Sequence, residues 1–179
     1  MCGIVGGTSE RNILPILVEG LRRLEYRGYD SAGVAFKKNG TIDVVKNAGR
    51  VDQLAKKLKL KENSANLGIA HTRWATHGVP SEKNAHPHAS KDIFIVHNGI
   101  VENHEELKAQ LRSEGMRFSS QTDSEVIAHL VQYYVEKGQS FEKAVFNAIK
   151  KLKGAYALGI LNKKEPEQLI GIRNQSPLV

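Results

Sequence analysis

Short apolar runs separated by turn signals recur along the chain, and this pattern limits the folds that the chain can adopt. Runs with the length and composition of β-strands cover residues 4–7, 34–36, 42–46, 67–70, 93–96, 155–161 and 169–172. Between two of them stands Asn39-Gly40, a strong signal for a two-residue hairpin, so that pair is expected to be antiparallel. The pattern therefore favours antiparallel sheets over a doubly wound parallel sheet.

Amphipathic stretches with helical periodicity lie between these runs. We expect helices over residues 13–27, 51–60, 103–115, 122–138 and 140–152. Ser140 is an expected N-cap, and the pairs Asn103–Glu106 and Thr122–Glu125 have the positions of capping boxes. Together the strands and helices predict a layered α+β sandwich.

One domain over residues 1–179 accounts for a chain of this length. Within it, the polar segment 71–92 contains Pro80, Pro87, Gly78 and several histidines, and it is predicted as a long irregular loop. Loops of this length inside a compact domain are often functional. Candidate site residues are therefore expected in and around this segment.

The net charge of +7 raises the question of nucleic-acid binding. The lysines are scattered or lie at helix ends, without an arginine-rich face interleaved with aromatic residues, so no nucleic-acid partner is expected. No apolar run is long enough to span a bilayer, so no membrane partner is expected. A single cysteine excludes an internal disulfide and favours a reducing, cytoplasmic setting.

Cys2 is the only cysteine, and loss of Met1 would make it the N-terminal residue. It would then carry a thiol, with an ordinary pKa near ~8.5, and a free α-amine with a pKa near ~7.7–8.0. The partly neutral amine could serve as the base for the thiol. A small buried residue at the start of an edge strand is the other interpretation of Cys2, and these residues alone leave it open.

Polar residues elsewhere suit a cysteine nucleophile that acts on an amide. The Asn98 side chain and the Gly99 backbone N–H could both donate to a developing oxyanion, although Asn-Gly is also typical of an ordinary turn. Arg73 could pair with a substrate carboxylate. Asp123 could pair with a substrate ammonium, or it could simply be a favourable acid at a helix start.

The segment around Arg73 holds further candidates. Thr76 and His77 could add hydrogen bonds to a substrate, and Trp74 could instead be a core anchor for its loop. A metal site is also conceivable from the histidines, which include His71, His77, His86, His88 and His97. None has the spacing of a zinc motif and no second cysteine exists, so no metal and no cofactor are expected.

Five phrases of the sequence together resemble one family. They are residues 1–6, 20–33, 71–78, 97–103 and 122–125. In order and spacing they resemble the N-terminal glutaminase domains of the glutamine–fructose-6-phosphate aminotransferases, also called glucosamine-6-phosphate synthases. This group belongs to the class II glutamine amidotransferases of the N-terminal-nucleophile fold. The resemblance covers essentially the whole chain.

For the fold, the resemblance implies a four-layer αββα sandwich of antiparallel sheets. It also implies that residues 1–179 are an incomplete glutaminase domain, because the domain of that family runs past Val179. The sugar-isomerase domains, which bind fructose 6-phosphate and receive ammonia for amino sugar biosynthesis, are not matched here. A homodimer of the parent enzyme is a further implication.

For the chemistry, the resemblance implies hydrolysis of the L-glutamine side-chain amide through a thioester on Cys2, whose own amine acts through a bridging water. It implies an oxyanion hole of Asn98 and Gly99. Arg73 would bind the substrate carboxylate, Asp123 its ammonium group, and Thr76 and His77 would line the pocket. Arg27 would support Cys2, Trp74 would gate the passage of ammonia, and His86 would lie beside the closing loop. A catalytically silent fragment that binds glutamine or a partner is the alternative, for instance with Met1 retained.

Overall fold

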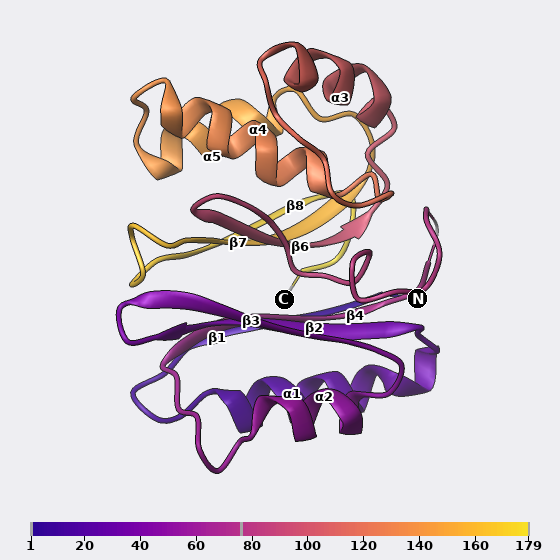
Figure 1. Cartoon of the computed structure of the whole chain (residues 1–179), viewed down its shortest axis with the longest axis vertical. Coiled ribbons are helices and arrows are strands. Elements are labelled where there is room, and N and C mark those ends of the chain that lie inside the picture. The colour runs from indigo at the N-terminus through magenta and orange to yellow at the C-terminus, as the bar shows by residue number, and fades with distance from the viewer. Residues whose placement is uncertain (1, 76, 179) are drawn as a thin grey trace.

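The computed structural model describes residues 2–75 and 77–178, and these form four layers, with helices outside two central sheets (Figure 1). Helices α1 (Leu14–Leu24) and α2 (Val51–Leu58) cover the first sheet, and α3 (His104–Ser113), α4 (Glu125–Glu136) and α5 (Phe141–Ile149) cover the second. The predicted α+β class and the αββα order of layers are both confirmed.

Each sheet contains antiparallel strand pairs. The first has the order β1 (Gly3–Thr8), β4 (Leu67–Arg73), β2 (Ser31–Lys38), β3 (Thr41–Ala48). The second has the order β5 (His88–Ser90), β6 (Ile93–Gly99), β7 (Tyr156–Asn162), β8 (Leu169–Asn174). The predicted hairpin joins β2 to β3: Lys38 pairs with Thr41, and Asn39 and Gly40 have φ of 50° and 75°, as a type I′ turn requires.

Apolar side chains fill the spaces between layers in three clusters. Between the sheets, Leu67 and Ile69 of β4 pack in one cluster with Phe94 of β6. At Gly68 a Cβ would lie 2.7 Å from Leu17 Cδ1, so glycine lets α1 approach the sheet closely. Full burial of one such leucine or phenylalanine stabilises by about 1.5–3 kcal/mol. The two central strands β4 and β6 are therefore held firmly against each other.

Near the candidate site residues, two strands extend further than predicted and a third strand was not predicted at all. β4 continues to Arg73 and β6 continues to Gly99, and the short strand β5 lies inside the segment predicted as a loop. Polar side chains at these positions, such as His71 and His97, are buried and hydrogen-bonded inside the protein, so they do not show the apolar pattern of a buried strand. As a result, candidate site residues stand on or directly after paired strands.

The two predicted capping boxes are wrong, because tertiary partners take the side chains. Asn103 directs its side-chain amide to the backbone beyond the end of α5. The Thr122 hydroxyl lies 3.0 Å from Nε2 of His88, and α4 begins later, at Glu125. Ser140 accepts a hydrogen bond from a backbone N–H in the first turn of α5, so that predicted cap is confirmed.

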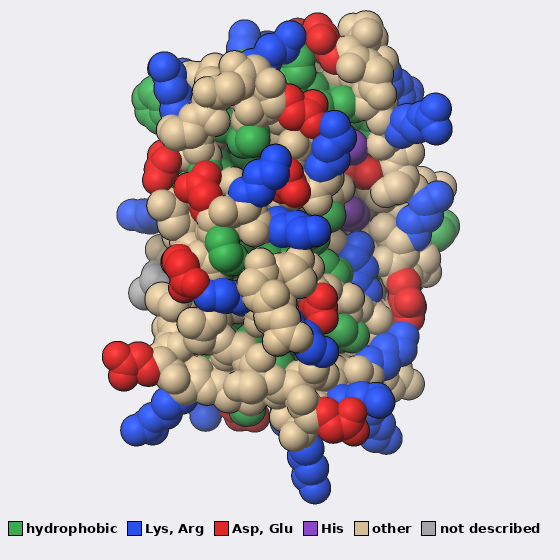
Figure 2. Space-filling model, turned by 60° about the vertical axis from the view of Figure 1, so that its left-hand side comes forward, with side chains coloured by type: hydrophobic (Ala, Val, Ile, Leu, Met, Phe, Trp, Pro, Cys, Tyr) green, Lys and Arg blue, Asp and Glu red, His purple; other side chains and the backbone are tan. Residues whose placement is uncertain are grey.

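The surface carries charges of both signs. On the face shown in Figure 2, Lys and Arg side chains are interspersed with Asp and Glu and do not gather into one stripe. Among the described helices, none is both long and apolar enough to cross a membrane.

Candidate active site

Cys2 lies directly before β1, next to the end of β4. The pairing of Gly3 with Thr72 brings Cys2 beside Trp74. The Cys2 Sγ accepts a hydrogen bond from the Trp74 N–H at 3.2 Å and lies 3.5 Å from the Trp74 carbonyl oxygen. Its side chain is half-buried rather than part of the core. The interpretation of Cys2 as a small core residue is therefore wrong.

Asn98 and Gly99 reach the same place from the other sheet. The Asn98 Nδ2 donates to the Cys2 carbonyl oxygen at 3.3 Å, and its Oδ1 lies 3.0 Å from His71 Nε2. Gly99 remains paired in β6, opposite Tyr156, so Asn98-Gly99 is no ordinary turn. Gly99 has φ of 137°, and a Cβ there would lie 2.0 Å from the Ala155 carbonyl oxygen, so the position requires glycine.

Arg73 is nearly fully buried, with 3% of its surface exposed. Its Nη1 donates to Asp30 Oδ1 at 3.3 Å, and its two terminal nitrogens also donate to the carbonyl oxygens of residues 77–79. Asp30 in turn accepts from the Ala75 N–H. The guanidinium therefore fastens the segment that follows β4 onto the end of the sheet.

Asp123 is also buried and precedes α4 rather than standing in its first turn. Its Oδ2 accepts from the Val101 N–H at 2.8 Å, and its Oδ1 accepts from the Ser124 hydroxyl at 3.3 Å. The Nδ1 of His77 is 4.0 Å from Oδ1. The interpretation of Asp123 as a helix-start acid is therefore wrong, and its carboxylate faces His77 across the site.

Two cavities meet at Cys2. A narrow polar cavity of about 20 Å³ is lined by Cys2, Arg73, Trp74, His77, His86, His97, Gly99, Thr122, Asp123 and Ser124. A wider cavity of about 810 Å³ is lined by Cys2, Gly3, Ile4, Leu24, Arg27, Trp74, Asn98, Gly99, Ile100, Ser176, Pro177 and Leu178. Cys2, Trp74 and Gly99 line both, so the thiol stands where a polar recess joins a larger hollow.

These linings bring together most of the predicted site residues. Cys2, Asn98, Gly99, Arg73, His77, Asp123, Trp74 and His86 lie around the polar recess or its junction, and Arg27 lies in the wider cavity. Thr76 is outside the described residues. Trp74 is 52% exposed, so the interpretation as a core anchor is wrong, and its ring lies so close to Gly28 that a Cβ there would be 2.3 Å from its Cζ3.

Burial sets the protonation of the site. Burial raises the pKa of the Cys2 thiol, and the hydrogen bond from Trp74 offsets this only in part, so the thiol is protonated at pH 7 and needs a base. Burial lowers the pKa of His71 to about 3 and that of His97 to about 4, so both rings are neutral. Neutral imidazoles act here as directional hydrogen-bonding groups. Within residues 2–75 and 77–178, no cluster of His, Cys, Asp and Glu side chains is arranged to hold a metal ion.

Two residues with structural roles at the site escaped the interpretation of the sequence. Asp30 has no role assigned from the sequence, although it binds the Arg73 guanidinium. His71 is one of the histidines for which a metal site is not expected, and its contact with the Asn98 side chain is not predicted from the sequence. A polar residue at the end of an apolar strand was the available signal in His71, but its partner stands on a different sheet.

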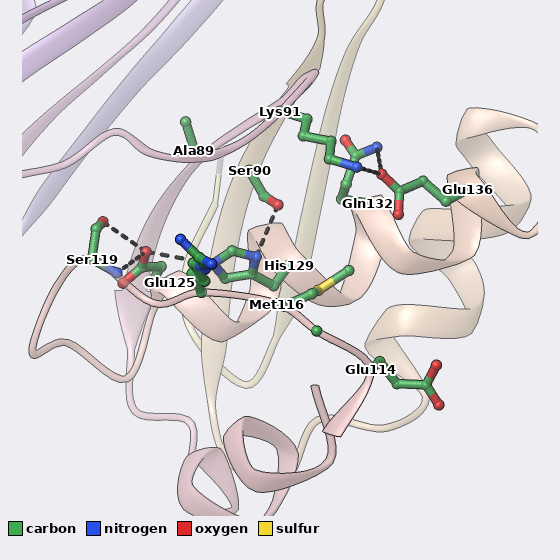
Figure 3. A pocket seen from close by; sticks show the side chains of 12 residues that line it. Ala89, Ser90, Lys91, Glu114, Met116, Ser119, Glu125, His129, Gln132 and Glu136 are labelled. Carbon is green, nitrogen blue, oxygen red and sulfur yellow. Dashed lines mark hydrogen bonds and ion pairs between the residues drawn. The ribbon is translucent and has the colours of Figure 1, made fainter. Parts of the chain in front are cut away.

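A further cavity of about 410 Å³ lies away from Cys2, between β5 and α4 (Figure 3). Ser90 Oγ is 2.9 Å from His129 Nδ1, and His129 Nε2 is 3.5 Å from Glu125 Oε1. The Glu125 carboxylate also accepts from the backbone N–H and hydroxyl groups of Ser119 and Ser120. Because these groups saturate its oxygens, the carboxylate fastens the segment before α4 and holds no open coordination site.

Replacing Glu125 with glutamine is expected to lower the free energy of unfolding by about 2 to 4 kcal/mol at pH 7, because an amide cannot accept all these hydrogen bonds. Burial alone would raise the pKa of Glu125, but the hydrogen bonds from His129, Ser119 and Ser120 outweigh it and hold the pKa well below its ordinary value. The carboxylate therefore stabilises the fold above pH ~4.3, and this contribution is lost as the pH falls through the folded-state pKa. Denaturant titrations at several pH values measure both effects.

The control is Glu136→Gln on the same helix, where the carboxylate is 39% exposed and pairs with Lys91. A surface pair of this kind contributes about 0 to 1 kcal/mol. Equal losses of unfolding free energy in the two variants at pH 7 would contradict the role given to Glu125. So would a difference in unfolding free energy between Glu125→Gln and the unchanged protein that does not shrink as the pH is lowered.

Known proteins share both the sequence and the fold. A family model described as a glutamine amidotransferase domain matches residues 71–178. A glutamine–fructose-6-phosphate aminotransferase (isomerizing) of Acinetobacter baylyi is 54% identical over the whole chain, which covers 29% of that protein. One from Legionella pneumophila is 52% identical, again over the whole chain and 30% of that protein. The chain thus spans about 30% of the length of these curated relatives.

A solved amidotransferase structure has a similar fold at lower sequence identity. The glutamine phosphoribosylpyrophosphate amidotransferase of B. subtilis matches with a TM-score of 0.72 and 27% identity. The match covers 90% of this chain and 35% of that one. The arrangement of two sheets with outer helices is therefore shared with a known amidotransferase.

Proposed function

Because the chain belongs to the glutamine amidotransferase family, we propose that it hydrolyses the side-chain amide of L-glutamine to glutamate and ammonia, with Cys2 as the nucleophile. One observation carries this proposal: Cys2 stands at the junction of a polar recess and a wider cavity, and the Asn98 amide donates to its backbone carbonyl oxygen. A nucleophile, an oxyanion donor and a lined recess are the parts that acyl transfer from an amide needs.

The chemistry proceeds in two stages. After loss of Met1, the neutral α-amine of Cys2 removes the thiol proton through a bridging water, and the sulfur attacks the amide carbon. Asn98 Nδ2 and the Gly99 N–H donate to the oxyanion that forms. The amine returns the proton to the leaving nitrogen, which departs as ammonia. Water then attacks the thioester, and glutamate leaves.

Substrate recognition uses the charged residues of the recess. Asp123 binds the α-ammonium group, and Arg73 binds the α-carboxylate after its terminal nitrogens release the carbonyl oxygens of residues 77–79. The recess, with a volume of about 20 Å³, has room for about one water molecule, so this segment must move to admit glutamine. His77 belongs to this segment and lines the pocket. Thr76 is assigned the same role from the family resemblance.

The remaining residues guide the product and support the nucleophile. Trp74 lines both cavities, so its movement gates the passage of ammonia from the recess to the wider cavity. Arg27 lies in the lining of that cavity and supports Cys2. His86 lies in the lining of the recess beside the moving segment.

The role of the chain in a larger reaction follows from the names of its relatives. We assign residues 1–179 to a glutaminase domain that supplies ammonia for conversion of fructose 6-phosphate to glucosamine 6-phosphate. That conversion requires sugar-isomerase domains outside the matched region. The setting is the cytoplasm, in amino sugar biosynthesis, and the parent enzyme is a homodimer.

A test separates activity from simple binding. Protein with and without Met1, distinguished by intact mass, is incubated with L-glutamine, and glutamate and ammonia are measured. We expect equal amounts of both products from the form that begins with Cys2, and a loss of about 10²-fold or more when Met1 blocks the amine. A glutamine analogue with an electrophilic ketone should form an adduct on Cys2.

A second candidate rests on the observation that Met1 precedes Cys2 in the sequence. If Met1 is retained, the chain is a silent module that binds glutamine or a partner. Glutamine binding without turnover in every preparation would favour this candidate. Equal turnover with and without Met1, or an adduct on another residue, would contradict the mechanism.

A further inference from the structure

His71 stands behind the Asn98 amide, on the neighbouring sheet. It lies on β4 and is fully buried. Its Nε2 is 2.9 Å from the His97 carbonyl oxygen and 3.0 Å from Asn98 Oδ1. A carbonyl oxygen can only accept, so Nε2 must carry the proton. The Asn98 atom that faces this N–H is therefore the amide oxygen.

The imidazole is held in this orientation by its surroundings. The ring of His86 stacks on it, with centroids 4.1 Å apart and an interplanar angle of 19°. The Nδ1 of His86 accepts a hydrogen bond from the His97 N–H at 3.2 Å, which fixes the His86 ring to β6, the strand that carries Asn98. Burial lowers the pKa of both histidines, so His71 presents a single N–H toward Asn98.

We propose that His71 is a positioning residue for the oxyanion hole, because its Nε2–H holds the Asn98 amide with Nδ2 toward Cys2. This inference rests on the proposed glutaminase function. An asparagine amide has nearly the same shape in its two flipped orientations, and only one of them offers a donor to an oxyanion. The other would direct an oxygen at the developing negative charge. His71 selects between them.

The opposite end of His71 agrees with this role. Its Nδ1 is buried and finds no hydrogen-bond partner among the described residues. With the proton on Nε2, Nδ1 is an acceptor, so the group left without a hydrogen bond is a lone pair and not an N–H. The reverse tautomer would bury an unpaired N–H and place two lone-pair groups against each other at Asn98. The environment thus favours the tautomer that orients the amide.

The test compares His71→Met with His71→Gln, both in protein that begins with Cys2. Methionine fills a similar volume without a donor, whereas the glutamine amide can place an N–H close to the position of Nε2. We expect His71→Met to lower kcat for glutamine by about 10- to 100-fold, less than the full loss of an oxyanion donor, with a small change in KM. His71→Gln should recover most of this loss.

A second measurement reports on the oxyanion itself. L-Glutamate γ-semialdehyde adds to the Cys2 thiol and places an oxyanion in the hole, whereas the product glutamate does not. His71→Met should weaken aldehyde binding by the same factor as kcat and leave glutamate binding within about 3-fold. His129→Met is the control, because it removes a buried histidine at the cavity between β5 and α4. It should leave kcat unchanged.

The outcomes decide between positioning and general stability. Equal losses of aldehyde and glutamate binding, or no advantage of His71→Gln over His71→Met, would overturn the proposal. If thermal unfolding shows that His71→Met does not fold, His71→Gln alone is compared with the unchanged protein. A loss of kcat or of aldehyde affinity beyond about 10-fold in His71→Gln would then overturn the proposal. Failure of the unchanged protein to release glutamate or bind the aldehyde would instead contradict the glutaminase function.

Discussion

Replacement of Cys2 by alanine is expected to lower glutamate release by about 10⁴-fold or more, because the thiol is the only group proposed to bond to the substrate carbon. The side chain is half-buried, and within residues 2–75 and 77–178 its Sγ forms hydrogen bonds only with the Trp74 backbone, so stability should change by less than about 1 kcal/mol. Glutamine affinity should persist. Steady-state assays, thermal unfolding and calorimetric binding to the variant measure the three quantities.

Cys2→Ser is the matched control for the shape of this site. A serine hydroxyl preserves the size and the hydrogen bond from Trp74 but is a much weaker nucleophile, so binding should be kept and turnover lost. Turnover above about 1% in Cys2→Ala would show that another group attacks the amide. Loss of glutamine binding in both variants would contradict the expectation that Cys2 acts in turnover and not in substrate affinity.

Periodicity predicted a layered α+β sandwich because burial and period agree in most elements, and the family resemblance supplied the order of its four layers. The hairpin at Asn39-Gly40 formed as predicted, since glycine and asparagine supply the positive φ that a type I′ turn needs. The ends of β4 and β6 were missed because their polar side chains satisfy one another across the two sheets. Hydrophobic periodicity indicates where apolar side chains are buried. It does not indicate where polar side chains are buried with their hydrogen bonds formed inside the protein.

The site shows the same division. Cys2 is a candidate because of its thiol and α-amine, and Asn98 because its amide can donate to an oxyanion. The family resemblance implies the role of each. Local sequence could not show that Arg73 binds Asp30, because the two residues are 43 positions apart. Its bonds to residues 77–79 are close in sequence, but they depend on how the segment after β4 folds back, which periodicity does not record. Asp123 illustrates the reverse error: its local pattern indicated a helix start, but its partner is the Val101 backbone.

Asn98→Ala is expected to lower kcat by about 10²- to 10³-fold, because one oxyanion donor is typically worth about 3 kcal/mol in the transition state. KM should change little, since the amide acts on the charge that develops during reaction. Asn103→Ala is the matched control: its amide also bonds to backbone, beyond the end of α5, but it lines neither cavity at Cys2. It should lower stability without changing kcat.

The same variant decides how His71 acts. If His71 works only through Asn98, adding His71→Met to Asn98→Ala should cause no further loss of kcat, and the two effects will be strongly non-additive. Gly99 cannot serve as an alternative probe, because a Cβ at that position would lie 2.0 Å from the Ala155 carbonyl oxygen and disturb the strand pair. A loss below about 5-fold in Asn98→Ala would remove Asn98 from the oxyanion hole. Full additivity in the double variant would give His71 an effect that does not pass through the Asn98 amide.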